Sequence, residues 1–252
     1  MELFNTNRTG PYSLGSGNAA TMLPLPVIAP DTFEKLARAY ELQDPGAYLP
    51  RGVDKTIVAG YAAQQKALAA AMRSRGTGYY NLYLSGGSRE GAIVFLHPTS
   101  RGTVLINITD PIFGDPIVDY RSLTNPTDLD IWIAFTRFTR RFFKVPSLQV
   151  YQPREVLPGL NVTSDEDIAA YVRESMNPST FHPVGTCSML PRELGGVVSQ
   201  ELLVYGVKHL SVVDASIMAT IPGAYTQQTT YMIGEKVRFL LFCYPLFLAL
   251  GC

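Results

Sequence analysis

Residues 181–189 read Phe181-His182-Pro183-Val184-Gly185-Thr186-Cys187-Ser188-Met189. The segment joins a predicted helix to a predicted strand, and it carries one of only three histidines in the chain of 252 residues. Proline and glycine inside so short a segment are typical of a tight connection. A histidine in this place is a candidate for proton transfer, because imidazole gains and loses a proton close to neutral pH.

Upstream, helix-like and strand-like patterns alternate. Helical spacing, N-capping residues and acidic first turns predict four helices, with Thr32, Thr127 and Ser164 as expected caps. These helices are expected over residues 33–42, 54–73, 128–144 and 164–175. Residues 1–30 contain much glycine, asparagine and proline and are predicted to form a surface loop.

Aromatic and alternating apolar residues predict strands over 79–84, 92–96 and 102–108, with a loop at 85–88. We expect the three strands to share one antiparallel sheet. Shorter strands are predicted at 196–198, 202–204 and 210–213, followed by a last helix from Thr229 to Leu240. The predicted class is therefore α+β, with an antiparallel sheet flanked by helices.

Composition narrows the possible partners. The formal net charge is zero and no basic stripe is present, which argues against nucleic acid. The three cysteines are scattered, and no Cys-x-x-Cys or His-x-x-x-His pair occurs, so we predict no metal. His97 and His209 are expected at the surface or in loops.

Two further blocks follow the His182 segment. One runs from Val204 through Asp214-Ala215-Ser216, and the other reads Ile221-Pro222-Gly223-Ala224-Tyr225-Thr226-Gln227-Gln228 and continues to Lys236. The ordered set of three blocks resembles the C-terminal part of the glucose-methanol-choline (GMC) flavin oxidoreductases. Asn7-Arg8-Thr9-Gly10-Pro11-Tyr12 is similar to the fungal alcohol oxidases and dehydrogenases of that family.

The resemblance implies a partial substrate-binding domain over 1–186 and the C-terminal segment of an FAD-binding domain over 187–236. Members of the family carry an N-terminal Gly-x-Gly-x-x-Gly turn that brings backbone close to the FAD pyrophosphate. Gly15-Ser16-Gly17 and Gly86-Gly87 have neither this spacing nor its context. We therefore expect the chain to be the C-terminal half of such an enzyme, without its N-terminal dinucleotide-binding part.

The resemblance also implies roles for single residues. His182 corresponds to the family's catalytic base, and the other interpretation is a buried, hydrogen-bonded histidine. Tyr225 stands where the family usually has histidine or asparagine. A phenol keeps its proton at neutral pH, so Tyr225 would donate a hydrogen bond to the substrate oxygen or simply line the pocket. FAD contacts are implied for Asp214, Ala215, Thr226 and Gln227, with a helix cap as the other interpretation of Asp214.

The function implied is FAD-dependent oxidation of a small-molecule alcohol, with hydride transferred to flavin N5. A lyase or cyclase with non-redox FAD and a non-enzymatic remnant remain open as alternatives. Residues 237–252 form an atypical apolar tail that is shorter than the ~20 residues of a membrane span and contains Pro245. We expect a misread exon end, with the helix broken at Pro245, and no membrane anchor. Sequons at Asn7, Asn107 and Asn161 are acceptors for glycosylation only if the chain enters the secretory route.

Overall fold

The computed structural model describes residues 2–13, 19–84 and 91–249. The chain divides into two compact units, each assembled from segments that are distant in the sequence. Unit 1 comprises residues 1–42, 67–99 and 123–177, and unit 2 comprises residues 43–66, 100–122 and 178–252. Both units combine helices with antiparallel strands, which confirms the predicted α+β class.

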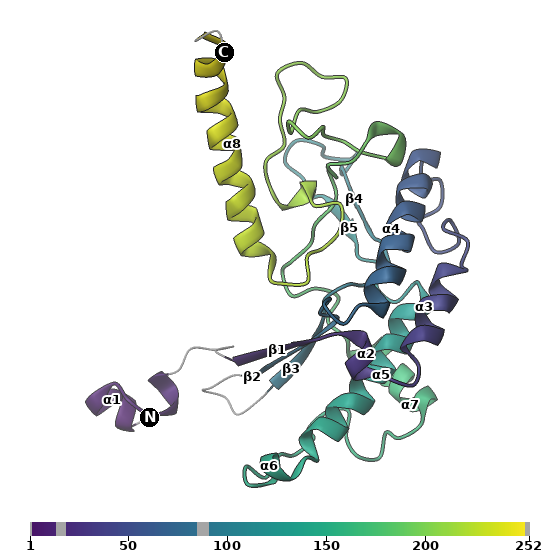
Figure 1. Cartoon of the computed structure of the whole chain (residues 1–252), viewed down its shortest axis with the longest axis vertical. Helices are drawn as coiled ribbons and strands as arrows, with labels where there is room; N and C mark the ends of the chain where they lie inside the picture. The colour runs from purple at the N-terminus through teal and green to yellow at the C-terminus, as the bar shows by residue number, and fades with distance from the viewer. Residues whose placement is uncertain (1, 14–18, 85–90, 250–252) are drawn as a thin grey trace. The chain divides into compact units, whose positions relative to one another are not determined.

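Unit 1 contains a three-stranded antiparallel sheet in the order β1-β2-β3 (Figure 1). Its strands are β1 (Ala19–Leu23), β2 (Tyr80–Leu84) and β3 (Gly91–Phe95), and Leu82 pairs with Thr21 on one side and Ile93 on the other. The predicted strands at 79–84 and 92–96 are confirmed. The prediction of a loop over residues 1–30 is wrong at β1, where a partner strand supplies hydrogen bonds that local propensity does not reveal. It is also wrong at the short helices α1 (Glu2–Asn7) and α2 (Leu25–Ile28). The loop predicted at 85–88 lies outside the described residues.

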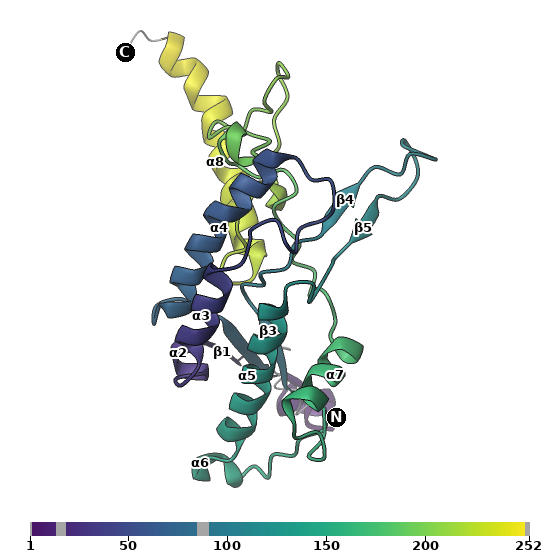
Figure 2. The same cartoon turned by 90° about the vertical axis from the view of Figure 1, so that its right-hand side faces the viewer.

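The strand predicted at 102–108 does not join this sheet. Only Thr103–Leu105 is extended, as β4, and it pairs with β5 (Ile117–Asp119) in a separate two-stranded ladder of unit 2 (Figure 2). An alternating pattern predicts an extended segment but does not specify its partner, and the turn-rich residues between 106 and 116 allowed a local hairpin.

Two helices of unit 1 begin after residues whose side chains cap them. In α5 (Pro126–Phe143), Oδ1 of Asn125 accepts a hydrogen bond from the backbone N of Thr127 at 3.0 Å, so the cap lies two residues before the predicted Thr127. Ser164 caps α7 (Asp165–Ser175) as predicted, accepting from Asp167 N at 3.0 Å, whereas Thr32 makes no side-chain cap on α3 (Phe33–Glu41). The short helices are α1 (Glu2–Asn7), η1 (Pro11–Ser13), α2 (Leu25–Ile28) and α6 (Pro146–Gln149).

An aromatic cluster joins the sheet to α5. The Phe135 ring is fully buried and meets Tyr80, Phe95 and Trp132 in edge-on contacts, with centroid separations of 5.1, 5.4 and 5.7 Å. Aromatic pairs in this arrangement add stability beyond the area they bury. His97 lies in the bend after β3, within the loop alternative of its prediction, but it is buried and packs on Tyr79 at 5.1 Å, so a surface position is wrong.

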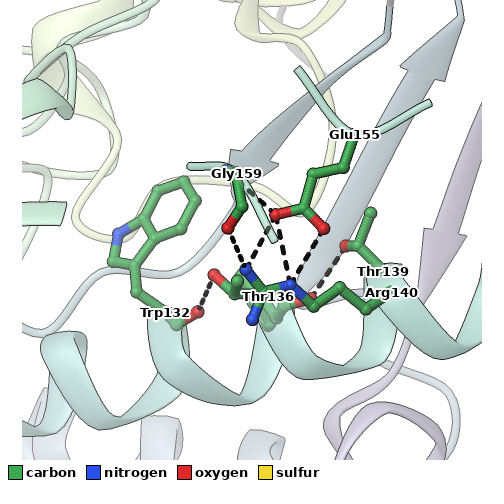
Figure 3. A network of polar contacts seen from close by, with 7 residues as sticks. Trp132, Thr136, Thr139, Arg140, Glu155 and Gly159 are labelled. Atoms are coloured by element: carbon green, nitrogen blue, oxygen red, sulfur yellow. Dashed lines mark hydrogen bonds and ion pairs between the residues drawn. The ribbon is translucent and has the colours of Figure 1, made fainter. Parts of the chain in front are cut away.

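A charged pair holds the loop that follows α6 (Figure 3). Nη2 of Arg140 on α5 lies 2.7 Å from Oε1 of Glu155, and Nε lies 3.0 Å from Oε2. The same guanidinium donates to the carbonyl of Gly159 at 3.1 Å, while the amide of Gly159 donates back to Glu155. The planar guanidinium and the carboxylate match in geometry and make two parallel hydrogen bonds, which fixes residues 155–159 against α5.

In unit 2, loop-rich chain surrounds a small core of Val198, Leu202 and Ile217. The strands predicted after His182 are wrong as regular strands. Only isolated bridges occur there, such as Val198 with Val204, because the chain turns too often to extend a ladder. Two 3-10 helices, η2 (Arg192–Leu194) and η3 (Ala215–Ile217), lie in this part.

The last helix, α8, runs from Thr226 to Ala249. It starts three residues before the predicted Thr229 and continues past Pro245, so the predicted break is wrong. A proline removes one backbone donor and disfavours the helix without always ending it. In the part of the chain that the structure describes, no helix combines the length and apolarity needed to cross a bilayer.

Gly60 marks a close backbone approach within unit 2. It lies in α4 (Lys55–Arg73), and a Cβ atom at this position would overlap the carbonyl oxygen of Leu194 in η2. Alanine is the better helix former by about 1 kcal/mol, but the steric conflict with backbone works in the opposite direction. We expect Gly60→Ala to lower stability by about 1–3 kcal/mol, measured by urea unfolding.

Gly234→Ala is the matched control. Gly234 lies in α8 and has open space around the position of a Cβ atom. There the helix preference of alanine acts alone, so the unfolding midpoint should stay level or rise. A Gly60→Ala variant that is as stable as Gly234→Ala would show that α4 and η2 do not approach this closely.

Candidate active site

The His182 segment meets the first turn of α8 within unit 2. Nδ1 of His182 lies 2.7 Å from Oγ1 of Thr226, the first residue of that helix. Thr226 is buried with 6% of its surface exposed, whereas His182 is partly exposed. One ring nitrogen is therefore held by the protein. Nε2 makes no hydrogen bond to any residue in the described part of the chain.

The backbone around His182 is unusual on both sides. Phe181 has a φ of 65°, in the left-handed region that residues with a Cβ adopt at a cost of roughly 1–2 kcal/mol. Its ring is 94% exposed, so packing of the ring does not explain the conformation. Gly185 has a φ of 87°, which glycine adopts without strain. Residues held in sparsely populated conformations are frequent at functional sites.

Tyr225 lies beside the histidine. The centroids of the two rings are 5.4 Å apart, with the ring planes tilted by 46°, although the residues are 43 positions apart in the sequence. Tyr225 is 41% exposed. The two residues predicted to act on substrate are thus neighbours.

An open hollow of about 660 Å³ lies at this place. Four of its eight lining residues were predicted to contact substrate or cofactor, whereas the predicted Tyr225 is not among them. Phe181 and Pro183, which flank His182, were not predicted as contacts, and Thr230 and Tyr231 on α8 were missed. Both follow a predicted residue by four positions on α8, and residues at this spacing share a helix face. The lining is formed by Phe181, His182, Pro183, Ala215, Thr226, Gln227, Thr230 and Tyr231.

Asp214 has a structural task. Its Oδ1 accepts a hydrogen bond at 2.8 Å from the backbone N of Ser216 and so caps η3. The cap presents Ala215 to the hollow, where Gln227 of α8 also lies. Asp214 itself does not line the hollow, and its predicted contact with a cofactor stays a prediction.

The lining is almost uncharged. It includes no aspartate, glutamate, lysine or arginine, so the imidazole of His182 is the candidate base in the lining. The described residues hold no group of three His, Cys, Asp or Glu side chains arranged to bind a metal. Flat and small apolar surfaces, such as Tyr231, Pro183 and Ala215, combine with the amide of Gln227 and the N-terminus of α8. This set suits a large heterocycle with polar edges better than it suits a phosphate.

Three comparisons relate this chain to known proteins. Residues 98–234 match the family model of the GMC oxidoreductases, C-terminal part. Dehydrogenase xptC of Emericella nidulans is 38% identical over 202 residues, which cover 80% of this chain and 32% of that protein. An FAD-dependent oxidoreductase from Chaetomium thermophilum superposes with a TM-score of 0.85 at 33% identity, covering 94% of this chain and 40% of that one. A fungal aryl-alcohol oxidase gives a TM-score of 0.82 at 37% identity, covering 91% and 39%.

The coverage is uneven. Nearly all of this chain is matched, but it spans only about a third of the length of dehydrogenase xptC.

Proposed function

The chain belongs to the GMC oxidoreductase family, and from this premise we propose that it forms the substrate-side, C-terminal part of an FAD-dependent enzyme that oxidises an alcohol. The observation that carries the proposal is the position of His182. Its ring is tied to Thr226 at Nδ1 and lines an uncharged hollow beside Tyr225. The hollow would admit an alcohol together with one face of a flavin.

The chain's own residues would handle the proton and the oxygen of the substrate. An alcohol oxidised to a carbonyl loses the hydroxyl proton and a hydride from the same carbon. His182 would take the proton, while the Tyr225 hydroxyl would donate a hydrogen bond to the substrate oxygen. When bound, FAD supplies the acceptor for the hydride at N5.

Residues around the hollow would hold the flavin ring. Ala215 would approach it closely, Gln227 would bond a polar edge, and the first amides of α8 would favour partial negative charge on the ring. Thr226 would contribute its backbone amide, and Asp214 would act through the η3 cap. The lining has no cation for a pyrophosphate.

In the decisive experiment, this chain is joined to the dinucleotide-binding half of a GMC relative, and the joined protein is purified. We expect a bound flavin whose absorbance bleaches when aryl or aliphatic alcohols are added without oxygen. A flavin that stays bound and oxidised with every alcohol, while a substrate is cleaved or cyclised, would favour the lyase or cyclase. A purified joined protein that holds no flavin would indicate that this chain is the non-enzymatic remnant.

By itself the chain should bind FAD weakly. Its sequence contains no Gly-x-Gly-x-x-Gly motif, the turn that brings backbone amides to the pyrophosphate in the family. Titration of the 252-residue chain with FAD, followed by quenching of flavin fluorescence, should show no tight, stoichiometric complex. The joined protein, titrated in parallel, is the control. Recovery of the chain alone with one FAD per molecule would contradict this prediction.

A further inference from the structure

We infer that Thr226 is a positioning residue that sets the tautomer of His182: its hydroxyl oxygen accepts from Nδ1–H and so leaves the lone pair of Nε2 for the substrate proton. The inference rests on the proposed function, because it concerns the base of that reaction. It gives the Thr226 side chain a task different from the cofactor contact that the resemblance implied.

The geometry assigns the contact to one ring nitrogen. The separation of 2.7 Å between Nδ1 and Oγ1 is that of a short hydrogen bond, and Thr226 is almost fully buried at the start of α8. The backbone carbonyl of Thr226 is bonded separately, by the hydroxyl of Thr230 at 2.9 Å. In the described part of the chain, His182 is the hydrogen-bond partner of the Thr226 hydroxyl.

The direction of the bond follows from the chemistry. A neutral imidazole has one N–H and one lone pair, and the hydrogen bond at one nitrogen selects the tautomer. If the Thr226 hydroxyl donated to Nδ1, then Nε2 would carry the hydrogen. The ring would then have no lone pair facing the hollow, because the lone pair of Nδ1 would be occupied by Thr226.

A Thr226 hydroxyl that accepts a hydrogen bond from Nδ1 suits both the neutral and the protonated imidazole of His182. Nδ1 carries a hydrogen in the neutral Nδ1–H form and also in the protonated ring. The bond to Thr226 therefore persists while Nε2 gains the proton, and no group has to reorient. The Tyr225 ring packs beside the imidazole, with the two ring centroids 5.4 Å apart.

The test reads the tautomer directly in the 252-residue chain. With nitrogen-isotope-labelled histidine, only three imidazoles contribute to the NMR spectrum, and His182→Gln identifies the signals of His182. At a pH where the ring is neutral, we expect a protonated, pyrrole-type Nδ1 and an unprotonated, pyridine-type Nε2. Thr226→Val should shift the population towards the Nε2–H form, which solvated histidine favours.

Two variants separate positioning from general disturbance. Thr226→Ser keeps a hydroxyl and should restore the wild-type tautomer. Thr230→Val makes the same change one turn later in the same hollow, at a hydroxyl bonded to backbone, and should leave the tautomer unchanged.

An Nε2–H tautomer in the unmodified chain would overturn the inference, as would a Thr230→Val effect equal to that of Thr226→Val. The wild-type and Thr226→Ser spectra decide the question even if Thr226→Val does not fold. No flavin or alcohol is present in this measurement, so its failure is distinct from failure of the proposed function. Alcohol oxidation by the joined protein together with an Nε2–H tautomer would refute the inference alone.

Discussion

Replacing His182 by alanine in the flavin-loaded joined protein is expected to lower kcat for alcohol oxidation by ~10²–10⁴-fold, the usual contribution of a positioned general base. In the proposed reaction, hydride leaves the substrate carbon as its hydroxyl loses a proton. Without the imidazole, the lining contains no other histidine, aspartate or glutamate to serve as the base. Flavin content should be unchanged, as measured by absorbance, and kcat by steady-state turnover.

Tyr225→Phe is the matched comparison at the neighbouring ring. It removes one hydroxyl donor, and a neutral hydrogen bond contributes ~0.5–1.5 kcal/mol net, which corresponds to a loss of about tenfold or less. His182→Gln adds a second control, because an amide can still bond to Thr226 but does not serve as a base. Near-normal turnover of His182→Ala with flavin bound, or a larger loss in Tyr225→Phe, would remove His182 from the role of base.

Local signals predicted the helices better than the sheets. Residues 33–42, 54–73 and 164–175 carry their own helical spacing, with a cap at Ser164, and α3, α4 and α7 lie there within about two residues. The start of α5 was displaced because Asn125 precedes a proline that fits the first helical position. Helix ends depend on a few neighbouring residues, so the sequence near them holds most of the information.

Strand pairing depends on residues that are far apart in the chain. Thr21 and Leu82 pair across about sixty positions, and β1, with two alanines among its five residues, has weak intrinsic preference for a strand. The segment Thr103–Leu105 was predicted as extended, but its partner was not, because alternation encodes which side chains face out and not which strand lies beside them. The isolated bridges around Val198 show the same limit.

In the candidate site too, short motifs predicted some features, whereas others depend on the tertiary structure. His182 and Tyr225 were identified from short motifs, and the structure brings their rings together. The bond between His182 and Thr226 joins residues 44 positions apart and required the fold, since no local pattern encodes it. Thr230 and Tyr231 were within reach of sequence reasoning, since each repeats a predicted residue at i+4 on a helix. Motifs located the reacting groups, and tertiary structure determined which atoms they touch.

The largest expected effect on stability is at Phe135. Its ring is fully buried where β2, β3 and α5 meet, and it contacts Tyr80, Phe95 and Trp132. Phe135→Ala removes these contacts and leaves a cavity that rigid aromatic neighbours cannot fill. We expect a loss of about 3–5 kcal/mol, the range for buried phenylalanine truncated to alanine. Trp132, the only tryptophan, lies in unit 1 and makes urea unfolding of that unit visible by fluorescence.

Tyr151→Ala is the control, because it truncates another aromatic ring of unit 1 to alanine at a side chain that is 78% exposed. Surface changes of this kind usually alter stability by no more than about 0.5 kcal/mol. Both variants remove an aromatic ring from unit 1, so the difference between them mainly measures burial. If Phe135→Ala unfolded at the same urea concentration as Tyr151→Ala, the aromatic cluster would not be the core of unit 1, and the packing of α5 on β2 and β3 would be wrong.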